Sequence, residues 1–363
     1  MRRMDMPTRP TQRKGRGTAS NDSGRFETEK RIPFDDGWGT ADEEPVPLAT
    51  TLSIDSSRTI IARNDSPDIG FDRSINPYRG CEHGCIYCYA RPSHAYLGLS
   101  PGLDFESRLF YKPQAAKLLA AELSKKGYAC RPIALGSNTD PYQPVERRLG
   151  ITRAILEVLR DFRHPVTIVT KSALIQRDLD ILGAMAKERL AIVTISVTSL
   201  DRQLARVMEP RAATPERRLE TISALAAAQV PAGVLTAPMI PALNDTEMEQ
   251  ILERAGAAGA TSAGYTLLRL PFELKTLFRE WLEAHFPNRA AHVLSLVAQT
   301  HGGRLYDSTW SKRMTGTGPY AEVLRLRFER ACRRLGFNER TTKPLDTSRF
   351  LPPLQTGDQL ALF

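Results

Sequence analysis

Residues Asn76–Pro92 read NPYRGCEHGCIYCYARP. This stretch holds three of the five cysteines, Cys81, Cys85 and Cys88, in the spacing C-x3-C-x2-C. Three thiolates on one tight loop suit three corners of a cubic iron–sulfur cluster, and the fourth iron is then left without a protein ligand. An open coordination position is typical of catalytic metal sites, whereas structural sites are closed.

A zinc site is the alternative interpretation of this loop, with His83 or His94 as the fourth ligand. No second CxxC or HxxxH pair follows to complete a common zinc module. A disulfide framework does not suit a long chain with few cysteines in odd number. The ligand types therefore favour iron–sulfur over zinc.

The CxxxCxYC loop resembles the cluster loop of the radical S-adenosylmethionine (SAM) superfamily. With the segments TDPYQPVE at 139–146 and VTKS at 169–172, the chain resembles the group related to spore photoproduct lyase, the DNA repair photolyase-like proteins. The resemblance covers about Ser74 to Gly302. It implies a [4Fe–4S] cluster on Cys81, Cys85 and Cys88, SAM bound at the open iron, and reductive cleavage of SAM to a 5′-deoxyadenosyl radical.

Length and composition fit one large domain with a real core, since the chain has 363 residues and is 41% hydrophobic. No apolar run is long enough to span a membrane, and the N-terminus lacks the apolar segment of a signal peptide. We therefore expect a cytoplasmic protein. The net charge of +9 and the pI of about 9.4 permit an anionic partner such as nucleic acid without requiring one.

The composition divides the chain into five parts. These are a disordered arm at 1–50, a lead-in segment at 51–73, the radical SAM core at 74–302, a basic loop and helix at 303–341, and a flexible tail at 342–363. Within the lead-in, Thr51–Arg63 alternates apolar and polar residues and is expected to form an edge strand or a hairpin arm.

In the core, six short apolar or β-branched stretches alternate with helical patterns, which indicates an α/β fold with a parallel sheet. The predicted strands are Ser74–Tyr78, Pro132–Gly136, Val166–Lys171, Ala191–Ser199, Ala232–Pro238 and Ala263–Leu268. The predicted helices are Lys112–Lys126, Ile151–Phe162, Ala173–Lys187, Pro215–Ala228, Asp245–Gly256 and Leu274–His285. Thr214-Pro215 and Asn244-Asp245 are typical helix starts, with a capping residue followed by a proline or an acid. This pattern alone does not separate a doubly wound sheet from a barrel. The resemblance implies a partial (β/α)6 TIM-like barrel, open on one side.

In either architecture, site residues gather at the C-terminal ends of the strands. The resemblance implies SAM contacts there from Tyr89, Thr139, Asp140, Lys171, Ser196 and Thr198. Two of these side chains have a second interpretation. Asp140 also suits the cap of a following helix, and Lys171 also suits a solvated surface position.

The substrate is not fixed by the resemblance. In spore photoproduct lyase a cysteine near the end of the second strand returns a hydrogen to the product, but Ser137–Asp140 contains no cysteine. DNA lesion repair or DNA modification is the leading hypothesis, with an electron donor such as flavodoxin or ferredoxin. RNA or protein modification remains open, as does a non-catalytic DNA-associated protein with a structural three-cysteine metal site.

The C-terminal part offers two further features. The predicted helix Tyr320–Leu335 carries five arginines against two glutamates, and a basic helix of this kind suits a phosphate backbone. The chain ends in QLALF, which resembles the short motif by which bacterial proteins bind the replication sliding clamp, through Gln359, Leu360, Leu362 and Phe363. The alternative is that this tail packs on its own barrel.

Overall fold

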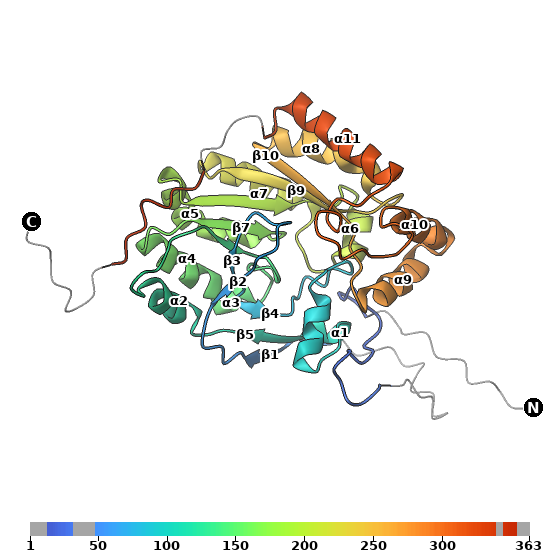
Figure 1. Ribbon diagram of the computed structural model, residues 1–363, viewed down its shortest axis with the longest axis horizontal. Coiled ribbons are helices and arrows are strands. Elements are labelled where there is room, and N and C mark those ends of the chain that lie inside the picture. The colour runs from blue at the N-terminus through green and yellow to red at the C-terminus, as the bar shows by residue number, and fades with distance from the viewer. Residues whose placement is uncertain (1–12, 32–47, 339–343, 354–363) are drawn as a thin grey trace, which may run out of the picture.

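The computed structural model describes residues 13–31, 48–338 and 344–353 (Figure 1). Its main sheet has seven strands in the order β10-β9-β8-β7-β6-β3-β2. Six of them are parallel to their neighbours, and the edge strand β2 (Ile61–Arg63) is antiparallel. The parallel strands are β3 (Arg73–Ile75), β6 (Ile133–Leu135), β7 (Val166–Thr170), β8 (Ala191–Ser196), β9 (Ala232–Met239) and β10 (Ser262–Leu267).

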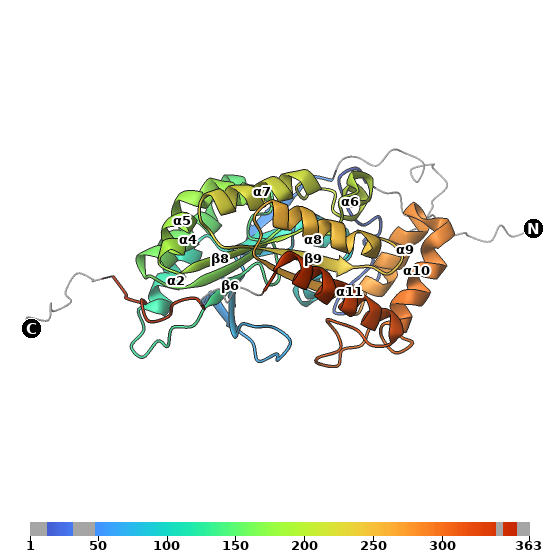
Figure 2. The same cartoon turned by 90° about the horizontal axis from the view of Figure 1, so that it is seen from above.

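The strand order distinguishes the two architectures that the sequence pattern left open. A doubly wound sheet reverses its strand order at a switch point, whereas here each parallel strand lies beside the one before it in the chain. Figure 2 shows α4, α5 and α7 along one side of this sheet. The prediction of an α/β fold of the partial-barrel type is therefore confirmed.

Each predicted helix has a counterpart in the structure, because its apolar stripe packs against the sheet, whereas α1, α3 and α6 were not predicted. They are α1 (Leu103–Ser107), α2 (Ala115–Leu123), α3 (Glu146–Leu149), α4 (Ile151–Asp161), α5 (Leu179–Lys187), α6 (Arg202–Met208), α7 (Pro215–Ala227), α8 (Met248–Ala257), α9 (Leu274–His285), α10 (Pro287–Gln299) and α11 (Pro319–Leu335). The 3-10 helices are η2 (Arg91–Leu97), η3 (Ala173–Asp178) and η4 (Asp245–Glu247).

Two helix starts were predicted from their capping residues, Thr214 and Asn244, and the structure treats the two side chains differently. Thr214 caps α7 as its sequence predicts, since its side chain accepts from the backbone N–H of Arg217. Asn244 also precedes a helix as predicted, since η4 begins at Asp245, but its side chain does not cap that helix. Its side chain accepts from Ile240 N at 2.7 Å and donates to Thr198 O at 2.8 Å, so it ties β9 to β8 instead.

A second, small sheet of three strands was not predicted. Its order is β1 (Thr51–Ile54), β5 (Arg108–Tyr111) and β4 (Tyr78–Arg79). The Thr51–Arg63 segment therefore forms no single strand. Its first part lies parallel to β5, and its last part becomes β2 at the edge of the barrel.

Residues 13–31, named here the N-terminal strap, differ from the expectation of a disordered arm. Arg16, Thr18 and Ser20 are buried. The backbone N–H groups of Gly17 and Thr18 donate to the Glu106 carboxylate at 2.9 and 3.1 Å, and Arg16 Nη1 donates to Glu106 O at 2.6 Å. Their polar composition resembles a solvated tail, but these polar groups are paired with the domain.

At the other end of the chain, the clamp-like motif at Gln359, Leu360, Leu362 and Phe363 lies outside the described residues. It stays a prediction. Within the described ranges, no helix combines the length and apolar character needed to cross a membrane.

Candidate active site

The cysteine loop follows β4 at the C-terminal side of the first barrel strand. Cys81 and Cys85 are buried and Cys88 is partly buried, and all three are free thiols. The loop turns at Gly80 and Gly84, whose φ angles are +77° and +68°. A side chain at either position would also collide with its surroundings, since a Cβ on Gly84 would lie 2.7 Å from a Glu106 oxygen.

A single arginine holds this loop from inside. Arg91, with no exposed surface, donates to Gly84 O at 3.0 Å and to Cys85 O at 2.9 Å. It also donates to the carbonyls of Pro101 and Gly102 and to Glu106 Oε1 at 2.5 Å. The curvature of the loop is therefore fixed by protein groups.

Burial raises the pKa of the Cys81 and Cys85 thiols well above the ordinary range. Asp140 adds to this effect at Cys81 and Glu209 at Cys85, while the nearby Lys171 ammonium acts in the opposite direction at Cys85. Thiols in such surroundings ionise when a cationic metal centre binds them. Three of them on one loop fit the donor set of a cuboidal cluster with one open iron.

The alternative zinc site needs an imidazole from His83 or His94, and both side chains have other partners. His83 Nδ1 lies 3.3 Å from Asp140 Oδ2, and His94 Nε2 lies 3.0 Å from Arg108 O in an edge contact with Phe105. Within the described part of the chain, no group of three or more His, Cys, Asp or Glu side chains converges on one point as the ligands of a single ion would.

The end of β6 carries Thr139 and Asp140. The Asp140 carboxylate accepts from Thr170 Oγ1 at 2.7 Å and from Lys171 N at 2.8 Å, so it ties the end of β6 to the end of β7. Burial raises its pKa, but His83 and these donors overcome that effect and hold the pKa at about 2. Thr139 Oγ1 donates to Tyr78 O at 3.0 Å. Both side chains thus shape the site by holding its backbone.

Lys171 is different, because its ammonium stays free. It lies 5.7 Å from the centre of the Tyr87 ring, and it forms no ion pair with the residues that the structure describes. A free cation beside Tyr87 and Cys85 can bind a carboxylate as a point charge. The interpretation of Lys171 as a solvated surface lysine does not fit this partly buried position.

At the end of β8, Ser196 and Thr198 are both buried. Ser196 Oγ donates to Ala237 O at 3.4 Å, and Thr198 Oγ1 donates to Glu209 Oε1 at 2.8 Å. Glu209 also accepts from the Tyr87 hydroxyl and from Arg218. This network fixes Tyr87, the residue before the last cysteine of the loop.

Tyr89 follows that cysteine and donates its hydroxyl to Ser137 O at the end of β6. Its ring lies under the guanidinium of Arg269, at 4.3 Å from the carbon to the ring centre. Tyr89 belongs to the 76–92 stretch, and Thr139, Asp140, Lys171 and Thr198 interact with Tyr78, His83 or Tyr87 of that stretch. Ser196 interacts with Ala237 instead, and the role of all six as SAM contacts stays a prediction. Only Lys171 among them presents a free charge.

Several residues that build this region were not predicted from the sequence, namely Asn76, Glu106, Gln143, Arg218 and Arg269. Asn76 Oδ1 accepts from Asn138 N at 2.9 Å, and Gln143 Oε1 accepts from Glu82 N at 2.8 Å. Arg269 alone had a usable signal, because a charge directly after an apolar strand lies at the end where sites form.

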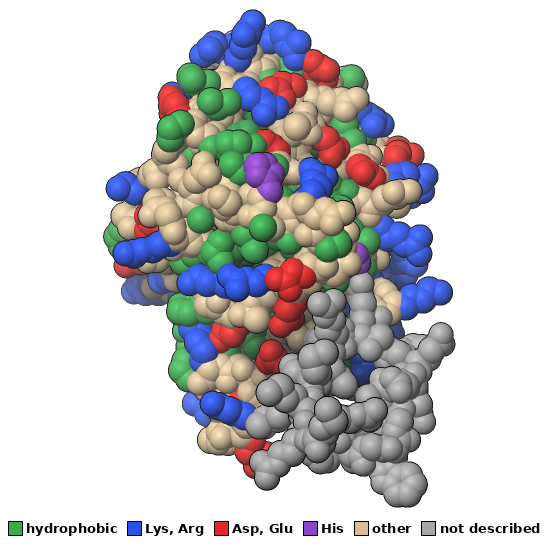
Figure 3. All heavy atoms as spheres, turned by 90° about the vertical axis from the view of Figure 1, so that its right-hand side faces the viewer, with side chains coloured by type: hydrophobic (Ala, Val, Ile, Leu, Met, Phe, Trp, Pro, Cys, Tyr) green, Lys and Arg blue, Asp and Glu red, His purple; other side chains and the backbone are tan. Residues whose placement is uncertain are grey.

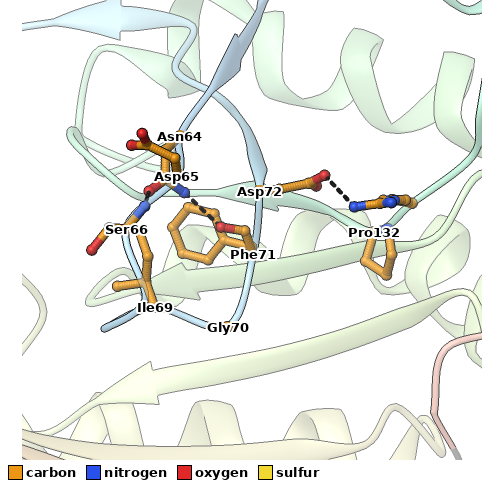
Figure 4. Close-up of a pocket in the computed structure, with 9 residues that line it drawn as sticks. Asn64, Asp65, Ser66, Ile69, Gly70, Phe71, Asp72 and Pro132 are labelled. Atoms are coloured by element: carbon orange, nitrogen blue, oxygen red, sulfur yellow. Dashed lines mark hydrogen bonds and ion pairs between the residues drawn. The ribbon is translucent and has the colours of Figure 1, made fainter. Parts of the chain in front are cut away.

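Two hollows lie away from the cysteine loop. One of about 400 Å³ is formed by the β2–β3 loop and the start of β6, where Asp72 pairs with Arg131 at 3.0 Å (Figure 4). The other, about 550 Å³, lies between α6 and the α9–α10 junction. Neither of these two hollows is lined by the cysteine loop.

Comparison with known proteins agrees with this geometry. The family model of the radical SAM superfamily matches residues 75–255. The chain belongs to this superfamily, whose members are enzymes that use a [4Fe–4S] cluster and SAM. An uncharacterized protein of Mycobacterium tuberculosis is 36% identical over 228 residues, which cover 62% of this chain and 67% of that protein. An uncharacterized protein of Methanocaldococcus jannaschii is 26% identical over 213 residues, covering 59% of this chain and 76% of that protein.

Solved structures of spore photoproduct lyase share the fold. A mutant of that enzyme with bound AdoMet and dinucleoside spore photoproduct has a TM-score of 0.56 at 15% identity, covering 79% of this chain and 80% of that chain. The enzyme complexed with dinucleoside spore photoproduct gives a TM-score of 0.55 with the same identity and coverage. The likeness establishes a shared partial-barrel architecture.

Proposed function

We propose that this protein generates a 5′-deoxyadenosyl radical at a [4Fe–4S] cluster held by Cys81, Cys85 and Cys88, and that it acts on DNA by repairing a lesion or modifying a base. The observation that carries the proposal is a set of three free thiols on one clamped loop beside the free ammonium of Lys171. Three thiolates leave one iron open for SAM.

The chemistry that the bound cluster and SAM supply is release of the 5′-deoxyadenosyl radical, which removes a hydrogen atom from the substrate. The protein contributes position and electrostatics. Lys171 attracts the SAM carboxylate, Asp140 holds the backbone that presents Lys171, and the Glu209 network holds Tyr87 against the cysteine loop.

DNA is favoured as the substrate by two observations. The barrel has the architecture of an enzyme whose solved complexes contain dinucleoside spore photoproduct, and the chain carries a net charge of +9. Helix α11 contributes less than its arginine content predicts. Arg325 pairs with Glu322 and Glu329, Arg327 with Glu249, and Arg334 with Glu253.

On the face shown in Figure 3, Lys and Arg side chains gather at the upper edge and are mixed with acidic and apolar side chains below. Arg330 and Arg333 are exposed and form no ion pair with the described residues. They are the cations of α11 that remain available to a phosphate backbone.

The hydrogen donor must differ from a cysteine at the end of β6. Cys130 precedes β6 at the opposite end of that strand, and Cys332 is buried in α11. This arrangement favours a lesion or modification other than the spore photoproduct.

The test is the yield of 5′-deoxyadenosine from the anaerobically reconstituted, reduced protein with SAM. The assay has arms without nucleic acid, with intact DNA, with ultraviolet-irradiated DNA and with RNA. We expect release in every arm and stimulation by DNA, and stimulation by irradiated DNA alone would identify repair. Stimulation by RNA alone would show that the substrate is RNA and not DNA. No release in any arm would contradict the proposed function.

A further inference from the structure

Arg269 is a cation at the mouth of the site that the chemistry described above does not use. It lies two residues after β10, and its guanidinium stacks on Tyr89 next to Cys88. Tyr306 and Cys88 are both close enough to interact with it electrostatically. The partial barrel thus brings the last parallel strand back to the end of the cysteine loop.

No counter-ion accompanies this guanidinium. Arg269 forms neither a hydrogen bond nor an ion pair with the residues that the structure describes, although it carries five N–H donors. The carboxylate of Asp68 is within electrostatic range but is already occupied. Its Oδ1 accepts from Ser311 N at 2.6 Å, and its Oδ2 pairs with Arg313.

The absence of a counter-ion destabilises the charged form of Arg269, because its guanidinium is largely shielded from water. Burial lowers its pKa, and although Tyr89, Tyr306 and Cys88 act in the opposite direction, the pKa stays below its ordinary value. Other enclosed arginines are paired, as Arg91 is with Glu106 and Arg218 with Glu209. A desolvated guanidinium without an anion is unfavourable until a ligand supplies one.

The anion is assigned by elimination. SAM has one carboxylate, and the proposed function assigns that carboxylate to Lys171, which lies near Cys85 at the end of β7. Arg269 approaches the same loop from β10, and β8 and β9 separate these two strands in the sheet. When a cluster is bound, Cys88 is itself a thiolate near this guanidinium, so any further anion at Arg269 comes from the substrate.

We propose that Arg269 is a substrate-binding residue that takes a phosphate of a nucleic-acid chain. The inference rests on the proposed function and deepens it. The planar fork of arginine binds two phosphate oxygens at once. Trp310, exposed in the loop that carries Arg313, offers an aromatic face on which a neighbouring base can stack.

The test compares wild type, Arg269→Gln, Arg269→Lys and the control Arg254→Gln as full-length proteins. Arg254 is exposed on α8 and forms no ion pair with the described residues. The probe is a fluorescently labelled twelve-nucleotide single-stranded DNA, followed by anisotropy at several salt concentrations. SAM binding is measured in parallel by equilibrium dialysis, and unfolding midpoints confirm that each variant is folded.

We expect Arg269→Gln to weaken oligonucleotide binding about tenfold and to reduce the slope of log affinity against log salt by about 0.7. Arg269→Lys should recover part of the affinity, because it keeps the charge but loses the fork. Arg254→Gln should bind like wild type, and SAM affinity should stay within twofold in all variants.

Three results would overturn the inference, namely no binding of the oligonucleotide by wild type, wild-type affinity in Arg269→Gln, or a loss that falls on SAM instead. The fate of the proposed function is read separately. Absence of 5′-deoxyadenosine from wild type removes that function. Normal release together with unchanged oligonucleotide binding in Arg269→Gln removes only the role of Arg269.

Discussion

Arg91 Nη2 and Glu106 Oε1 lie 2.5 Å apart in an ion pair from which solvent is fully excluded. The same guanidinium holds the carbonyls of Gly84 and Cys85, and the same carboxylate accepts from the amides of Gly17 and Thr18. One buried pair thus joins three segments that are distant in sequence, namely the N-terminal strap, the cysteine loop and α1. The geometry of the cysteine loop depends on this junction.

Glu106→Gln should destabilise the fold strongly, because it leaves the Arg91 charge buried without an anion. Breaking a buried pair in this way costs about 3–5 kcal/mol in free energy of unfolding. Urea unfolding measures the change. The control is Glu157→Gln, whose partner Arg153 is 3.4 Å away at a surface where Glu157 is 45% exposed. The control should lose less than about 1 kcal/mol. Equal losses in the two variants would contradict the role given to the buried pair.

Gly17→Ala should displace the N-terminal strap and loosen the cysteine loop. A Cβ at this position would lie 1.7 Å from Gly84 O, a distance at which the backbone must shift. Gly70→Ala is the matched control, since a Cβ there meets nothing within 4 Å. Hydrogen–deuterium exchange of residues 80–90 should be faster in Gly17→Ala than in wild type and unchanged in Gly70→Ala. Wild-type exchange in Gly17→Ala would show that the strap does not restrain the loop.

Stability should fall as the pH drops from 6.5 towards 4, partly through His164. This imidazole is fully buried, and burial lowers its pKa to about 4. Above pH 6.5 it is neutral in both states, so it adds no pH dependence. Below that, only the unfolded chain takes up the proton, which costs about 1.4 kcal/mol of stability per pH unit until the folded pKa is reached.

His164→Gln removes this contribution. The difference in unfolding free energy between pH 7 and pH 5 should therefore shrink by about 2 kcal/mol relative to wild type. His94, whose pKa burial also lowers to about 4, keeps its own share in the variant. A pH dependence equal to that of wild type would show that His164 does not titrate as its burial requires.

Lys171→Ala should weaken SAM binding about tenfold or more, because it removes a charge-assisted contact to the carboxylate. Equilibrium dialysis of the reconstituted protein measures this change, and iron content should be as in wild type. The control is Lys187→Ala, at an exposed position on α5. SAM affinity unaffected by the loss of Lys171 would shift the carboxylate contact to another residue.

The sequence predicted the parts of this protein that depend on local pattern. Strand β7 was predicted within one residue because all five of its residues are β-branched, and α7 because Thr214 and Pro215 mark a helix start. The small sheet could not be predicted, because its strand β4 has two residues, too few for any periodic pattern. The ordered structure of the N-terminal strap could not be predicted, because its polar groups are paired with partners far along the chain, such as Glu106.

The site residues also divide into those that a local pattern identifies and those that only the tertiary fold brings together. The spacing of its cysteines is local, so the loop that carries them could be identified from the sequence. The hydroxyl of Thr198, by contrast, was assigned to SAM, but in the structure it donates to Glu209 at 2.8 Å. Arg269 acquires its place over Tyr89 only when the sheet curves, which no local pattern encodes.

The central claim is that the cysteine loop holds a [4Fe–4S] cluster, and iron and sulfide content after anaerobic reconstitution tests it most directly. We expect about four of each per chain in wild type and in Cys130→Ala, whose thiol lies outside the loop, and loss of both in Cys85→Ala. In wild type, the electron paramagnetic resonance spectrum of the reduced protein should also change when SAM is added. Zinc in place of iron, or a cluster that persists in Cys85→Ala, would contradict the account.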